Sequence, residues 1–162
     1  MLDRAMRSAG VIWLSPDPSA PDAGTYPPTT GPVWQVWSEG ACYLLTGPGE
    51  QVLPGIVPRR GCHVIVRDSA GGRSLTWAAD VRAVDPAGPR WAEVAPKLAA
   101  SRLNGGDPVA VVPTWPGRLT ILCLSPSGVL ATPAAGLPDG SLAAPPLPSP
   151  ATTPYRMPSD DT

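Results

Sequence analysis

The sequence predicts a mainly β, α+β domain: a small antiparallel β-barrel with one inserted helix. Short β-branched or aromatic runs recur along the middle of the 162-residue chain, turn residues separate them, and one segment changes to a helical period. The five or six strands expected would leave too many open edges in a flat sheet of this size, so we expect the sheet to close. The length allows one compact domain of roughly 100 to 120 residues between proline-rich ends.

The first short strand is expected over 11–14, after a basic stretch with Arg4 and Arg7. This start superficially resembles a signal peptide, but the apolar run is too short and ends in a Ser-Pro-Asp-Pro sequence. A proline-rich surface arm then reaches residue 32. No stretch approaches the roughly 20 apolar residues of a membrane span, so a soluble, cytoplasmic protein is the expectation.

The next two runs, 33–37 and 41–46, predict an antiparallel hairpin. Between them lies Ser-Glu-Gly, in which Gly40 can supply a positive φ. Because side chains alternate along a strand, Trp34 and Trp37 then fall on opposite faces. Both faces of the hairpin therefore carry a large ring.

A second hairpin is predicted from strands over 62–67 and 73–84, joined by a turn over 68–72. Apolar side chains on the longer strand alternate with polar ones, which indicates one buried face. Arg67 and Arg82 lie on these strands and could face a binding groove; the alternative is solvent-facing partners for nearby aspartates.

The segment 90–103 has apolar residues at helical spacing. Pro96 lies inside it, so the prediction is either one kinked helix, slightly favoured, or a helix that starts near Ala95. The run 107–113, bounded by prolines, is expected to be extended, and 118–124 is the last strong strand.

These elements divide the chain into three parts. Residues 1–32 form an N-terminal strand and proline-rich arm, 33–128 the barrel core with its helix, and 129–162 a Pro/Ala-rich tail. The tail has no periodicity and few charges, so burial cannot offset the conformational entropy lost on ordering it. We therefore expect it to be disordered.

Composition excludes several classes of partner and site. Lys and Arg total 12 against 13 Asp and Glu, a net charge of −1, so nucleic acid and anionic membranes are disfavoured as partners. Three widely spaced cysteines, Cys42, Cys62 and Cys123, indicate buried reduced thiols rather than a disulfide or a metal site. No nucleophile with a base, metal cluster or phosphate loop stands out, so no catalytic residue can be assigned.

The order of elements resembles a known family. The succession Pro32–Trp37, Cys42–Gly47 and Glu50–Gly55, followed by the second hairpin and the helix, is similar to the FMN-binding split-barrel proteins, which are pyridoxamine-phosphate-oxidase-like. The similarity covers roughly 11–126 and is greatest to a small actinobacterial branch. It implies a small antiparallel split β-barrel and a homodimer with FMN in a groove between subunits.

The resemblance also implies site residues. In flavin-binding members the second strand ends in Thr or Ser, which Thr46 matches, and a basic residue a few positions later helps to hold the phosphate. This chain has Glu50 and Gln51 there. Arg59 and Arg60 could supply the missing charge, because paired guanidiniums suit phosphate oxygens; the alternative is a solvated turn.

Two tryptophans complete the candidate cofactor-binding set. Trp37, or alternatively Trp34, could stack on an isoalloxazine ring, although barrel core is the commoner position of a strand tryptophan. Trp115 belongs to a loop, where it could cover the pocket or meet the other subunit.

Three functions stay open at this point. The first is an oxidoreductase that binds FMN or a deazaflavin, in which the cofactor carries the hydride chemistry. The second is a cofactor-free dimeric split-barrel that serves as a binding module. The third is a scaffold whose tail, with a Pro-Pro-Leu-Pro sequence at 145–148, is recognised as a polyproline helix.

Overall fold

The computed structural model describes residues 2–17, 19–25, 29–67, 73–102 and 106–127. The strands of this part are β1 Val11–Pro16, β2 Val33–Trp34, β3 Val36–Ser38, β4 Ala41–Thr46, β5 Gly61–Arg67, β6 Arg73–Ala83 and β7 Thr120–Pro126. Its helices are α1 Leu2–Ser8, α2 Pro89–Ala100 and α3 Pro108–Val111, with 3₁₀ turns at Ala23–Thr25 and Val112–Thr114. The tail predicted over 129–162 lies outside the described residues.

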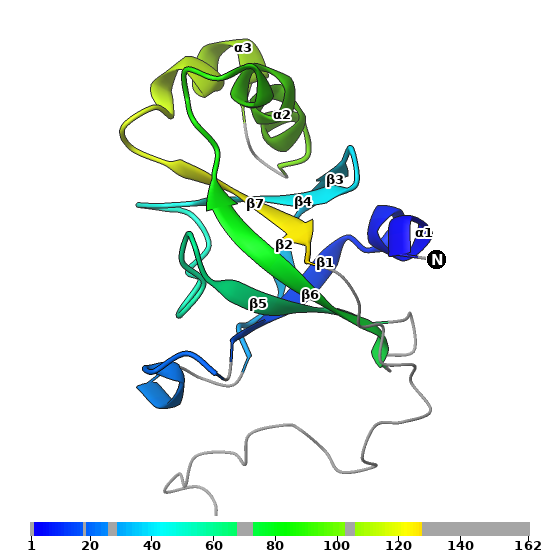
Figure 1. The fold of residues 1–162 in the computed structure, drawn as a ribbon. Helices are drawn as coiled ribbons and strands as arrows, with labels where there is room; N and C mark the ends of the chain where they lie inside the picture. Colours follow the sequence, from blue (N-terminus) through cyan, green and yellow to red (C-terminus); the bar gives the residue numbers. More distant parts are fainter. Residues whose placement is uncertain (1, 18, 26–28, 68–72, 103–105, 128–162) are drawn as a thin grey trace, which may run out of the picture.

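The strands form one antiparallel sheet in the order β2-β1-β5-β6-β7-β4-β3. The two outermost strands of this order, β2 and β3, are separated in sequence only by Gln35. One continuous segment therefore pairs with β1 on one side, where Val11 opposes Trp34, and with β4 on the other, where Val36 opposes Tyr43. This double pairing closes the sheet into the predicted small antiparallel barrel (Figure 1).

Both predicted hairpins are confirmed. Ser38 pairs with Ala41, so Glu39 and Gly40 form a two-residue turn with φ of 50° and 73°. Two positive φ angles in succession are the mark of a type I′ turn, whose twist matches that of the strands. The β5–β6 hairpin pairs in continuous register over most of β5, while the turn expected at 68–72 lies outside the described residues.

Alternation along the strands divides the apolar side chains into two clusters. The interior cluster comprises Met6, Ile12, Leu14, Val33, Trp37, Cys42, Leu44, Leu53, Ile56, Cys62, Val64, Val66, Leu75, Trp77, Ala79, Val81, Leu122 and Leu124. The outer cluster comprises Ala41, Tyr43, Leu45, Val84, Trp91, Val94, Ala95, Leu98, Ala99, Trp115, Leu119 and Ile121. Because β4 contributes to both, its residues 41–45 are buried on either face.

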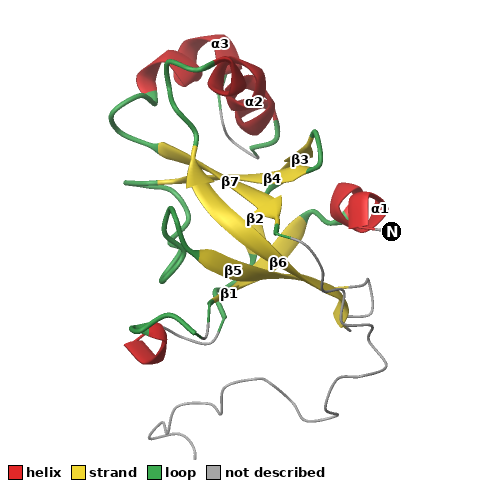
Figure 2. Cartoon of the chain, viewed as in Figure 1, coloured by secondary structure: helices red, strands yellow, loops and turns green. Residues whose placement is uncertain are grey.

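The helices cover different parts of the barrel (Figure 2). α2 packs its buried face onto the outer cluster, and α3 lies beside α2. Pro96 lies inside α2 with its ring exposed, so a single helix is correct and the start near Ala95 is wrong. The helix begins at Pro89, where a proline loses no hydrogen bond, and ends at Ala100, before the expected end at residue 103.

The extended run predicted over 107–113 is wrong. The structure places α3 there, followed by the 3₁₀ turn Val112–Thr114. The carboxylate of Asp107 accepts a hydrogen bond from Val109 N at 3.0 Å and caps the helix, and Pro108 occupies its first turn. This local capping prevails over the strand preference of the valines.

Two features of the N-terminal region were not expected. α1 precedes the first strand, and its Met6 side chain has no exposed surface. β1 continues to Pro16 and joins the barrel through β2 and β5. None of the described helices combines the length and the apolar composition needed to cross a bilayer.

Candidate functional site

A groove of about 740 Å³ opens beside the end of β6 and is lined by residues 58–60 and 80–83. Its volume lies within the range usual for small-molecule sites. Two segments distant in sequence form it: the end of the loop between β4 and β5, and the last residues of β6.

Backbone pairing brings these segments together. Arg59 N donates to Val81 O at 2.8 Å, and Val81 N donates to Arg60 O at 2.9 Å, which continues the β5–β6 ladder into the loop. Arg59 has a φ of 70°, in the left-handed region that favours glycine. A non-glycine residue in this conformation is strained, and such residues are enriched at ligand clamps.

Two guanidiniums of the groove have no partner among the described residues. Arg60 Nη1 is paired with Asp22 Oδ1 at 2.5 Å. Among the described residues, no hydrogen bond or ion pair engages the side chains of Arg59 and Arg82, which are exposed. Asp80 is the one carboxylate among the described residues that line the groove, so these residues form a net cationic surface.

Thr46 and Gln51 are brought together, but neither lines the groove. Thr46 Oγ1 donates to Gln51 O at 3.1 Å. The Gln51 side-chain amide donates through Nε2 to Trp34 O and accepts through Oε1 from Trp34 N, both at 3.0 Å. These side chains fasten the loop after β4 to β2.

Glu50, the acid in this loop, is ion-paired. Its Oε1 lies 2.7 Å from Arg102 Nη2, and its side chain is only 8% exposed. The pair links the loop to the residues just after α2.

The two candidate tryptophans are packed away from the groove. Trp37 lies in the barrel interior, edge to face with Trp77 at 6.0 Å between ring centroids, and its Nε1 donates to Asp3 Oδ1 at 2.6 Å. Trp115 is 2% exposed in the outer cluster.

Of the predicted candidates, the structure thus brings Arg59, Arg60 and Arg82 to the groove. Arg67 lies elsewhere, with its guanidinium 4.6 Å from the centroid of the Trp13 ring. Asp22 was not identified from the sequence, since it lies in the proline-rich arm 38 residues from its partner Arg60. No local pattern points to a contact of that span.

The buried thiols are not poised as nucleophiles. Burial raises the pKa of Cys62 to about 12, and burial raises the pKa of Cys42 well above its usual range. Both are therefore protonated at neutral pH. In the described ranges, no group of three or more His, Cys, Asp or Glu side chains is arranged to hold a metal ion.

Comparison with known proteins gives structural matches only. No family model matches the chain, and no curated protein matches it in sequence. A putative pyridoxamine 5′-phosphate oxidase from Listeria innocua superposes with a TM-score of 0.53 at 12% identity, covering 82% of this chain and 98% of that one. HutZ, a heme storage protein from Vibrio cholerae, superposes with a TM-score of 0.52 at 12% identity, covering 79% and 89%. The chain therefore shares the split-barrel fold of pyridoxamine-phosphate-oxidase-like proteins.

Proposed function

We propose that this chain binds a flavin-class cofactor, FMN or alternatively a deazaflavin, with the cofactor phosphate held in the groove between Arg59 and Arg82. The observation that carries the proposal is the presence, in one groove of suitable volume, of two guanidiniums that meet no partner in the described part of the chain. Each can donate two parallel hydrogen bonds to phosphate oxygens, and hydrogen bonds between charged groups are the stronger kind.

The phosphate end of such a cofactor fits the residues present. Arg60 adds positive charge, although Asp22 partly neutralises it. Asp80 repels a phosphate, so the favoured position is toward the arginines and away from this carboxylate.

The described residues of one chain do not provide a contact for the ring end of the cofactor. None of those that line the groove is aromatic. We therefore include in the proposal a homodimer, in which a second copy supplies a wall for the isoalloxazine ring. The cofactor would supply hydride transfer, and the residues of this chain would bind and orient it, which is the division of roles in an oxidoreductase of this kind.

A cofactor-free binding module is the second candidate function. The observation in its favour is that Thr46, Gln51, Trp37 and Trp115 all make structural contacts and none lines the groove. Under this alternative the fold is retained and the cofactor is lost.

Fluorescence quenching of FMN, titrated with the full chain, distinguishes the two. We expect saturable binding, weakened by about tenfold in Arg59→Gln and again in Arg82→Gln, since one charged hydrogen bond contributes roughly 1.5 kcal/mol. Arg118→Gln is the matched control, because Arg118 is exposed and outside the groove. A parallel titration with a deazaflavin compares the two cofactors. Absence of saturable binding of either cofactor would favour the cofactor-free module. Equal FMN affinity in all three variants would refute the placement of the cofactor phosphate in this groove.

A further inference from the structure

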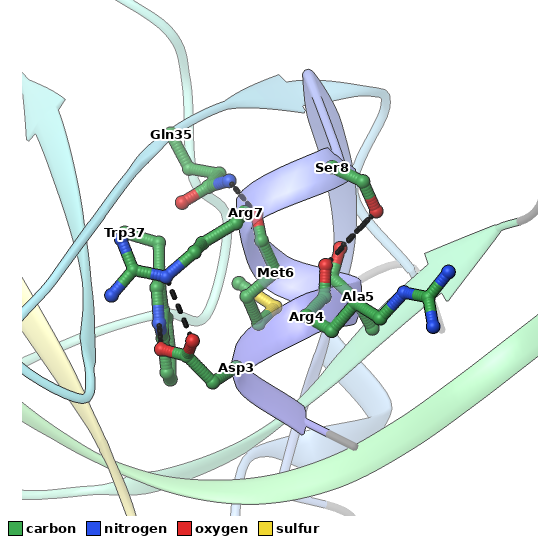
Figure 3. Close-up of polar contacts among 8 residues, drawn as sticks. All are labelled: Asp3, Arg4, Ala5, Met6, Arg7, Ser8, Gln35 and Trp37. Carbon is green, nitrogen blue, oxygen red and sulfur yellow. Dashed lines mark hydrogen bonds and ion pairs between the residues drawn. The ribbon is translucent and has the colours of Figure 1, made fainter.

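One end of the barrel is filled by α1. The Met6 side chain has no exposed surface and belongs to the interior cluster, against which Leu2, Ala5 and Ala9 also pack. Figure 3 shows the Met6 side chain on the side of α1 that faces Trp37. We call the place that α1 occupies, beside Gln35 and Trp37, the barrel mouth.

The barrel mouth presents three N–H groups, which donate to α1 and to Ala9, the residue that follows it. Trp37 Nε1 donates to Asp3 Oδ1 at 2.6 Å. Gln35 Nε2 donates to Met6 O at 3.0 Å and to Ala9 O at 2.8 Å. Because Gln35 and Trp37 are two positions apart on one extended segment, their side chains point to the same side.

α1 is an imperfect occupant of this place. Gln35 Oε1 and Trp77 Nε1 are buried without a hydrogen-bond partner in the described structure, and Trp77, only 3% exposed, packs edge to face on Trp37. Buried polar atoms normally have partners. A solvent-open depression of about 460 Å³ also lies beside α1, lined by residues 6–10 together with Gln35 and Trp37.

α1 is also weakly held. A helix of seven residues is too short to be stable on its own, so it depends on its contacts with the barrel. The ion pair between Asp3 and Arg7 is open to solvent, since their side chains are 58% and 62% exposed. Water can therefore compete with this ion pair.

We propose that the barrel mouth is a binding site for an alkyl carboxylate, and that α1 is its displaceable occupant. The alkyl chain takes the place of the Met6 side chain in the interior cluster. The carboxylate takes the place of the Asp3 carboxylate and of the Met6 and Ala9 carbonyls, and accepts from Trp37 Nε1 and Gln35 Nε2. An ionised carboxylate only accepts hydrogen bonds, so it matches a set of donors, whereas an alkylammonium does not.

The test uses the full chain and dodecanoate below its micelle concentration, with dodecanol as the uncharged match. The Trp37 indole N–H is observed by ¹H–¹⁵N NMR, since its shift reports the acceptor that it meets. We expect Asp3→Ala and Met6→Ala to bind dodecanoate about tenfold tighter than the native chain, because each removes part of the competing occupant. Arg4→Ala, on the exposed side of α1, is the control and should leave the affinity unchanged.

Three results would overturn the proposal: no saturable shift in any variant, equal affinity in the native chain and both variants, or dodecanol binding as tightly as dodecanoate. Met6→Ala removes a fully buried side chain, so circular dichroism must show that it folds. Asp3→Ala changes a mainly exposed residue, so its dodecanoate affinity tests the proposal if Met6→Ala does not fold. The barrel mouth and the groove share no lining residue, so the outcome is independent of flavin binding.

Discussion

Arg102 Nη2 lies 2.7 Å from Glu50 Oε1, and this ion pair fastens the loop after β4 to the residues that follow α2. Glu50 therefore does not bring an unpaired negative charge to the flavin-binding region that the family resemblance implies. Its side chain is 8% exposed and that of Arg102 26%, so the pair is largely removed from water.

Removing one partner of this pair should destabilise the protein. Arg102→Met leaves a buried carboxylate without its partner, and we expect a loss of about 1–3 kcal/mol in the free energy of unfolding. The double variant Glu50→Gln, Arg102→Met should recover part of this loss, because no unpaired charge remains. Urea denaturation of the native chain, the single variants Glu50→Gln and Arg102→Met, and the double variant measures the coupling, and strictly additive losses would show that the pair contributes nothing.

Replacing Arg59 by glycine should stabilise the protein and weaken its binding of FMN. The φ of 70° at this position is strained for an arginine, whereas glycine adopts it without steric cost. Arg59→Gly should therefore raise the free energy of unfolding by about 0.5 kcal/mol. The same change should weaken FMN binding, because a guanidinium is lost from the groove.

The matched control for this prediction is Glu39→Gly, at a non-glycine residue with a φ of 50° in the β3–β4 turn. It should give a similar gain in stability and leave FMN affinity unaltered. A fall in stability for Arg59→Gly alone, or undiminished FMN affinity, would contradict the assignment of Arg59.

Acid should release α1. The hydrogen bond from Arg7 and then that from Trp37 lower the pKa of Asp3 below its ordinary value of 3.8. A carboxylate whose pKa is lower in the folded state contributes its full stabilisation above pH 3.8, and this is lost as the pH falls through the folded-state pKa. The Trp37 indole N–H signal should therefore shift below about pH 4. In Arg7→Gln the pH midpoint of this signal change should move upward, and an unmoved midpoint would mean that Arg7 does not stabilise the Asp3 carboxylate.

Alkali should destabilise the barrel through Tyr43. Burial raises the pKa of Tyr43 from 10.0 to about 12, so between these values the unfolded chain releases a proton that the folded chain retains. The free energy of unfolding then decreases with rising pH over this window. Urea denaturation at several pH values should show a shallower decrease in Tyr43→Phe than in the native chain. Equal slopes would place the alkaline loss on other groups, such as the Cys62 thiol.

The hairpins and α2 could be predicted because their signals are local. A period of two, a glycine at the β3–β4 turn and a helical period after residue 89 act over a few residues each. The assignment of Trp34 and Trp37 to opposite faces is confirmed, since Trp37 lies in the interior cluster and Trp34 packs against the outer one.

The rest depends on contacts between distant residues. α1 is helical because Met6 enters the barrel and Gln35, 29 residues away, binds its backbone. The groove forms because the backbones of Arg59 and Arg60 pair with that of Val81. No spacing in the sequence predicts this pairing. Thr46 matches the family pattern in sequence and Gln51 stands where a basic residue is expected, yet here both hold a loop to Trp34.

The measurement that tests the central claim most directly compares the affinities of FMN and riboflavin, which differ only by the phosphate, for the native chain and for the Arg59→Gln, Arg82→Gln double variant. We expect FMN to bind the native chain at least about tenfold tighter than riboflavin, and the two ligands to bind the double variant about equally. Equal affinities for the native chain, or a preference for FMN that survives in the double variant, would contradict a phosphate site in this groove.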